Sequence, residues 1–217
     1  MSADVFVYLD VVQFSKNGVQ NRNQIKTPDG AAWLTLPVKH LLGQTLAKVQ
    51  LAESNYGIKH WRTLQANYAR TPGFVKWKTE LEELLTRPYP LLVDFALASV
   101  DWLLDKLQVE TRVVKASALE NVSGQASKLV ACICKSLSAT TYLTGTGALA
   151  YLDVSDFEEI HCDLLVQKWK SLQYEQTFPQ KGFVPDLSTL DLLLNCPDTA
   201  REMISSSGGW ERHPLNQ

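Results

Sequence analysis

The sequence predicts an α/β protein with a Rossmann-like, mostly parallel sheet, an N-terminal hairpin and a helical insertion. Residues 5–9 form an apolar run of strand-forming residues that ends at Asp10, which is typical of a strand buried on both faces. Helical periodicity occupies the middle of the chain, and a strand–helix–strand rhythm follows it. We therefore expect a single domain over residues 1–204 and a flexible tail over residues 205–217.

Residues 23–38 are predicted to form the hairpin. Thr27, Pro28, Asp29 and Gly30 place proline and glycine at positions that a β-turn favours. The apolar residues that follow the turn alternate with polar ones, as expected for a strand with one buried face.

Residues 56–108 are predicted to form the helical insertion. Trp77, Leu81 and Leu85 recur at the spacing of one helix face. Residues 91–107 are almost entirely apolar apart from three aspartates that share a narrow face, which predicts a mostly buried helix. This run is too short and too acidic to span a membrane.

The second half of the chain repeats strand and helix. Residues 111–115 and 140–143 are predicted strands, separated by a helix that we expect Ser123 to cap. A crossover helix between two strands implies parallel pairing, and residues 163–166 add a further strand. Ser188 and Asp191 have the spacing of an acidic capping box that opens a last helical region.

A glycine motif follows the second of these strands. Gly145, Gly147 and Ala150 match the spacing of a dinucleotide fingerprint. The acidic residue that should end the next strand is missing, since Asp163 begins that strand, so NAD binding is disfavoured. The alternatives are an ordinary strand-to-helix turn and a cradle in which the backbone of Gly145 and Gly147 binds an anion.

Charge is unevenly distributed along the chain. The formal net charge of −2 argues against a protein that binds nucleic acid through its overall charge. A local excess of basic residues suggests instead a site for a small anion such as phosphate. Residues 11–50 contain a single acidic residue, Asp29, and five basic ones: Lys16, Arg22, Lys26, Lys39 and Lys48.

The candidate site follows the first predicted strand. In open α/β sheets, ligands bind outside the carboxyl ends of the strands, where Asp10 lies, so Asp10 is a candidate catalytic residue. His60, a candidate general base, is the second catalytic candidate, with a packing role as its alternative. Cationic side chains can bind phosphate, and amide side chains can bind the hydroxyl groups of a sugar. The alternative is that these residues form a solvated, turn-forming loop without a ligand. The predicted ligand-binding residues are Gln13, Lys16, Asn21, Arg22, Asn23, Lys26, Gly145 and Gly147.

The cysteines and the N-terminus predict a cytoplasmic protein. The four cysteines form no CxxC pair and no disulfide framework, so we expect reduced thiols and no metal site. The first residues, Met1 to Asp4, lack a basic region of the kind that begins a signal peptide. The sequence predicts no particular cofactor or oligomeric state.

Five segments of this chain resemble the WbqC-like family of bacterial proteins. They occur in the family's order: ADVFVYLDVVQFSK at 3–16, NRNQIK at 21–26, WLTLPVK at 33–39, YLTGTGA at 142–148 and FVPDLSTLDLL at 183–193. Members usually carry a strand and a His-Gln-Pro-x-Tyr-Leu-Pro-Trp-type segment ahead of the first of these. The resemblance therefore leads us to expect an N-terminally short version of the family.

The resemblance implies a role in surface-polysaccharide biosynthesis of the O-antigen type. On that basis we expect a transferase-type protein that binds a phosphorylated or nucleotide-linked sugar precursor. Two alternatives stay open: a non-catalytic binding or assembly protein of the same pathway, and an acyl or aminoacyl transferase acting through Cys132, Cys134 or Cys162.

Overall fold

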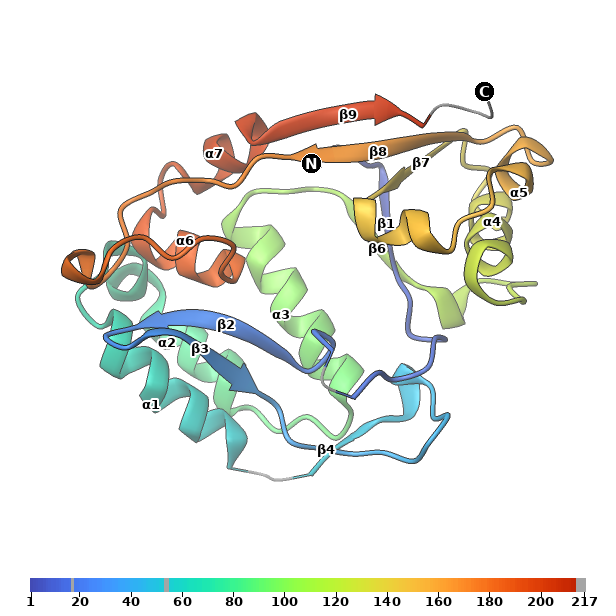
Figure 1. The fold of residues 1–217 in the computed structure, drawn as a ribbon. Helices are drawn as coiled ribbons and strands as arrows, with labels where there is room; N and C mark the ends of the chain where they lie inside the picture. The colour runs from blue at the N-terminus through green and yellow to red at the C-terminus, as the bar shows by residue number, and fades with distance from the viewer. Residues whose placement is uncertain (17, 53–54, 214–217) are drawn as a thin grey trace. The chain divides into compact units, whose positions relative to one another are not determined.

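The chain has a mixed α/β architecture with several small sheets. The computed structural model describes residues 1–16, 18–52 and 55–213 (Figure 1). It separates into two compact units. Unit 1 consists of Met1–Asp10, Thr111–Lys170 and Ser205–Gln217, and unit 2 consists of Val11–Glu110 and Ser171–Ile204.

Unit 1 contains two parallel strand pairs. Strand β1 (Val5–Tyr8) pairs with β6 (Arg112–Lys115), and β7 (Thr141–Thr144) pairs with β8 (Asp163–Trp169). Strand β9 (Gly208–Arg212) runs antiparallel along β8. The predicted strands at residues 5–9, 111–115, 140–143 and 163–166 are thus confirmed, with small shifts at their ends.

The described part of unit 1 also contains two α-helices and two 3-10 helices. These are α4 (Ala126–Ser136), α5 (Val154–Glu158) and the 3-10 helices Ala116–Ala118 and Thr146–Ala150. Phe157 is buried beside Val130 and Cys134 of α4, and its ring stacks on Tyr142 of β7 at 5.4 Å. The apolar face of α4 therefore packs against its neighbours as its periodicity predicts.

The structure corrects four expectations for unit 1. Phe6 of β1 is 47% exposed, so that strand is not buried on both faces. Strand β6 pairs with β1 and β7 with β8, so the described strands form no single Rossmann-like sheet. Helix α4 has Gln125, not Ser123, at its N-cap position. Residues 208–212, expected in a flexible tail, form β9, because their backbone groups pair with β8.

Unit 2 begins with the predicted hairpin. Strands β2 (Arg22–Thr27) and β3 (Gly30–Thr35) pair antiparallel. Gly30 adopts a φ of +104°, a conformation that side chains disfavour, and the Thr27 hydroxyl donates to its carbonyl at 2.9 Å. The short strands β4 (Val38–Lys39) and β5 (Gln50–Leu51) follow, and they enclose a loop that includes the 3-10 helix Leu46–Lys48.

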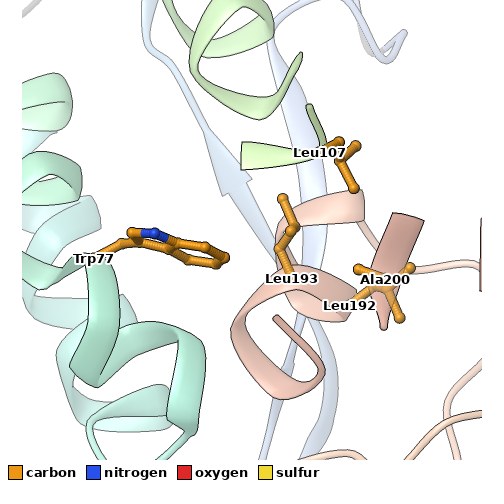
Figure 2. Packing of buried hydrophobic residues seen from close by; sticks show 5 residues of the cluster. All are labelled: Trp77, Leu107, Leu192, Leu193 and Ala200. Carbon is orange, nitrogen blue, oxygen red and sulfur yellow. The ribbon is translucent and has the colours of Figure 1, made fainter. Parts of the chain in front are cut away.

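The predicted helical region forms three helices in unit 2. These are α1 (Tyr56–Tyr68), α2 (Pro72–Thr86) and α3 (Leu92–Lys106). The chain returns to unit 2 at Ser171, where α6 (Thr189–Asn195) and most of α7 (Ala200–Ser206) follow. Proline opens α2, where its missing N–H costs no hydrogen bond. A core cluster joins α2, the end of α3, α6 and α7, as Figure 2 shows; its residues are Trp77, Leu107, Leu192, Leu193 and Ala200.

Helix α3 is less buried than its apolar sequence predicts. Leu92, Val93 and Phe95 are buried, whereas the rest of the helix is half-buried or exposed. Asp101 and Asp105 are exposed, as the predicted polar stripe requires. Within the described residues, no helix combines the length and the apolar character needed to cross a bilayer.

Candidate functional site

The open end of the β2–β3 hairpin, opposite its turn, carries a cation stacked on an exposed aromatic ring. Arg22 and Trp33 lie on one face of the hairpin, because alternate residues of a strand share a face and Trp33 pairs with Gln24. The guanidinium carbon of Arg22 lies 4.2 Å from the centroid of the Trp33 ring. That ring stays 45% exposed. The Arg22 Nε donates to the Gly18 carbonyl at 3.2 Å, which helps to fix the orientation of the guanidinium.

Lys16 lies in the turn that precedes this strand. The Gly18 N–H donates to the Ser15 carbonyl at 3.2 Å, and the Ser15 N–H donates to the Gln20 side chain at 2.7 Å. These bonds fold the segment back so that its Gly18 carbonyl contacts Arg22. Lys16 is exposed in that turn, so a second cation lies in the segment that leads into β2.

Lys26, at the other end of β2, is fully buried. Its side chain has no solvent-exposed area, and its Nζ donates to the Gly182 carbonyl at 2.6 Å. Burial lowers the pKa of Lys26, while the nearby Asp191 opposes that shift. In this structure the ammonium group cannot meet a phosphate in solvent, so the predicted contact between Lys26 and a ligand lacks support.

Asp191 is the centre of a buried polar cluster that the sequence did not reveal. Its carboxylate accepts hydrogen bonds from the Tyr68 hydroxyl, from the Tyr174 hydroxyl at 2.8 Å and from the Gln176 amide at 3.4 Å. The Tyr68 hydroxyl also accepts the backbone N–H of Lys26 at 2.8 Å. Burial raises the pKa of Asp191, and these donors partly offset the increase.

The remaining predicted ligand-binding residues of unit 2 differ in accessibility. Asn21 is buried and donates from its amide to the Leu36 carbonyl at 2.8 Å, a bond that stabilises the hairpin. Asn23 is exposed, and its side-chain oxygen accepts the Gln24 N–H. Gln13 is exposed, and its backbone forms a bridge with Thr45.

His60 has the surroundings of a packed histidine. It is 9% exposed, and its Nε2 lies 3.1 Å from the Thr35 carbonyl. Because a carbonyl only accepts, Nε2 carries the proton in this contact. Burial lowers the pKa of His60, and its ring packs edge-on against Tyr56. These contacts fit the packing alternative, and the role of general base stays a prediction.

The candidates of unit 1 lie at the carboxyl ends of parallel strands. Asp10 is buried after β1, where its two oxygens accept the Ser117 N–H at 2.9 Å and the Ser117 hydroxyl at 2.5 Å. Ser117 follows β6, the parallel partner of β1. Asp10 therefore ties together the two turns that leave this strand pair, and its catalytic role stays a prediction.

Gly145 and Gly147 lie after β7, in an exposed turn. A side chain at either position would meet nothing within 4 Å, and neither has a positive φ. Thr146–Ala150 is a 3-10 helix of five residues rather than the α-helix of a dinucleotide fingerprint. The turn is open to solvent, but it lacks the helix N-terminus that would bind a pyrophosphate.

Two of the three candidate nucleophilic cysteines, Cys134 and Cys162, are buried. Burial raises the pKa of the Cys134 thiol to about 12, and it also raises the pKa of Cys162. A raised pKa disfavours the thiolate, which is the nucleophilic form. In the described ranges, no group of three or more His, Cys, Asp or Glu side chains is arranged to hold a metal ion.

These observations define a mixed α/β chain whose hairpin carries an arginine over a partly exposed tryptophan ring. The chain belongs to the WbqC-like protein family, whose model matches residues 1–203. It is similar to the uncharacterized protein Rv1507c of Mycobacterium tuberculosis (strain ATCC 25618 / H37Rv), with 29% identity over 196 residues that cover 88% of this chain and 84% of the relative. No solved structure matches it significantly.

Proposed function

We propose that this chain is a transferase-type protein of bacterial surface-polysaccharide biosynthesis that binds a phosphorylated or nucleotide-linked sugar. Its membership of the WbqC-like family supports the context. The main observation in favour of a binding site is that the Arg22 guanidinium stacks on the Trp33 ring. Trp33 is nevertheless 45% exposed.

This pair offers both kinds of contact that such a ligand needs. A guanidinium group is planar, and when its face lies on an indole its N–H groups point along the plane, where they suit phosphate oxygens. The exposed part of the indole gives an apolar surface for a sugar ring or a base. Lys16, exposed in the adjacent turn, adds a second positive charge.

The proposed site is smaller than the sequence suggested. Lys26 and Asn21 are buried and hydrogen-bonded to the carbonyls of Gly182 and Leu36. Their side chains support the hairpin rather than face solvent. The site therefore consists of Arg22, Trp33 and Lys16. Asn23 is exposed, but it lies on the opposite face of β2 and is not included.

Calorimetric titration of the full chain with nucleoside-diphosphate hexoses and hexose 1-phosphates tests this proposal. Arg22→Ala is expected to weaken binding about tenfold or more, because a hydrogen bond to a charged group contributes about 1.5–3 kcal/mol. The affinity of the Arg22→Lys variant should lie between those of the unsubstituted chain and of Arg22→Ala, since lysine keeps the charge and loses the planar guanidinium. Trp33→Ala should also weaken binding.

Arg62→Ala provides the matched control. Arg62 is exposed on α1 of the same unit, so its loss changes the net charge equally and leaves the hairpin intact. Equal affinities of the Arg22→Ala and Arg62→Ala variants would remove the hairpin end from the site. Absence of binding to every sugar phosphate tested would overturn the proposed ligand class.

The contacts of the two catalytic candidates favour a second function, that of a non-catalytic binding protein. Both oxygens of Asp10 accept hydrogen bonds from Ser117, and the His60 ring is buried against Thr35. Such contacts are typical of groups that stabilise a fold, which supports a binding role. A bound sugar nucleotide that stays intact with every acceptor supplied would support this second function, and measured group transfer would refute it.

A further inference from the structure

Two adjacent leucines in the loop between β4 and β5 are almost uncovered. Leu41 is 76% exposed and Leu42 is 98% exposed. Single exposed apolar residues are common on protein surfaces. Two consecutive leucines with so little cover are unusual, because each forfeits nearly all the stabilisation that burial would give it.

Hydrogen bonds hold this loop, the leucine loop (residues 39–48), in place. The Gln44 side-chain oxygen accepts the Leu41 N–H at 2.8 Å, and the Gln44 amide donates to the Lys48 carbonyl at 2.7 Å. The backbone N–H of Gln44 donates to the Leu41 carbonyl at 3.1 Å, and Gly43 has the positive φ, +79°, that this tight turn requires. The leucines are therefore displayed by an ordered turn.

The base of the loop is anchored to a neighbouring segment of unit 2. The Phe14 N–H donates to the Gln44 carbonyl at 2.9 Å. The buried Phe14 ring also packs edge-on against His40 at 4.9 Å. These contacts tie residues on both sides of the tip, His40 and Gln44, to Phe14, while Leu41 and Leu42 are exposed.

The surroundings of the leucines are cationic. Lys39, Lys48 and Lys16 are all exposed, on β4, in the loop and in the segment anchored to it. Residues 30–52 contain no aspartate or glutamate. The shallow hollow beside the tip is lined by residues 41–45 and Lys48, so lysine is its only charged lining residue.

We propose that the leucine loop, residues 39–48, docks onto an anionic lipid surface. A projecting apolar tip enters the boundary between headgroups and acyl chains, and lysines beside it remain at the level of the anionic headgroups. This complementarity of charge selects a bilayer over an apolar protein groove. The docked protein lies on the membrane and does not span it. The proposal does not depend on the ligand proposed for the Arg22 site, although Lys16 belongs to both surfaces.

Cosedimentation of the full chain with vesicles tests the proposal. The chain is expected to bind vesicles of phosphatidylcholine mixed with an equal amount of phosphatidylglycerol, and to bind phosphatidylcholine alone much more weakly. Added salt should weaken the binding, because it screens the lysines. Lys39→Gln and Lys48→Gln should each reduce the partition coefficient about fivefold.

The leucines are tested by Leu41→Ser combined with Leu42→Ser. Both side chains are exposed, so the fold should be unchanged, while binding to the mixed vesicles should fall at least about tenfold. Val75→Ser and Lys78→Gln on α2 are the controls, since both residues are exposed in the same unit, and neither should change binding.

Three results would overturn the proposal. The first is no binding of the unsubstituted chain to mixed vesicles. The second is unchanged binding of the double serine variant, which would show that charge alone attracts the chain. The third is self-association, measured by size-exclusion chromatography with light scattering, that the serine variant abolishes; a second copy of this chain would then cover the leucines.

Discussion

Replacing Tyr68 with phenylalanine should destabilise unit 2 through two buried groups at once. The Tyr68 hydroxyl donates to Asp191 and accepts the backbone N–H of Lys26 at 2.8 Å. Tyr68 and Asp191 have no exposed area, so water cannot replace the lost bonds without a rearrangement. Phenylalanine keeps the ring and leaves no large cavity, which isolates the hydrogen bonds from packing.

The magnitude follows from counting the groups left without a partner. An unsatisfied buried donor or acceptor costs about 1–3 kcal/mol, and Tyr68→Phe creates one of each, so we expect a loss of about 2–6 kcal/mol. Tyr174→Phe is the matched control, because it removes one hydroxyl from the same carboxylate and leaves Lys26 untouched. It should cost about 1–3 kcal/mol.

Urea unfolding followed by circular dichroism measures both losses, and hydrogen exchange locates them. In Tyr68→Phe, the backbone amide of Lys26 loses its acceptor and should exchange faster, while in Tyr174→Phe its exchange should be unchanged. The reasoning is refuted if Tyr68→Phe costs no more than Tyr174→Phe and the Lys26 amide stays equally protected.

Two further predictions concern packing and pH. Gly57→Ala should destabilise the chain by about 1–3 kcal/mol, since the added Cβ would lie 1.9 Å from the Leu85 carbonyl oxygen. Gly147→Ala is the control, because its added Cβ meets nothing, and it should leave the free energy of unfolding in urea unchanged. Equal results for the two variants would contradict the close contact of α1 with α2. For His60, burial lowers the folded pKa, so the unfolded state binds more protons and stability falls as pH drops below about 6.5. His60→Gln should remove that part of the pH dependence in unfolding titrations, and an unchanged pH profile would show that His60 contributes none of it.

Elements with a local cause were predictable from the sequence. The turn at Pro28 and Gly30 fixes the hairpin through backbone preferences of four neighbouring residues, and the structure contains it. The α1–α3 region was predictable because the buried positions recur every three or four residues, as Phe74, Trp77 and Leu81 do in α2.

Strand pairing was less predictable because it depends on residues far apart in the chain. A helix between residues 111–115 and 140–143 suggested that these two strands pair, yet β6 pairs with β1 and β7 with β8. The composition of an apolar strand also does not indicate how many other strands pair with it. Phe6 fits the interior of a sheet by composition, and it is nevertheless 47% exposed.

Asp191 shows most clearly where the sequence-based argument ended. With Ser188 it matched a capping box, and the Ser188 hydroxyl does cap α6 by accepting the Leu190 N–H at 3.3 Å. The second half of that motif is not used: the Ser188 N–H donates to the Gln24 carbonyl, while the Asp191 side chain accepts from Tyr68, 123 positions earlier. A local motif explains a residue only when no distant partner stabilises its side chain more. Buried tyrosine hydroxyls supply such a partner here, because a buried carboxylate without donors costs far more than an unused cap.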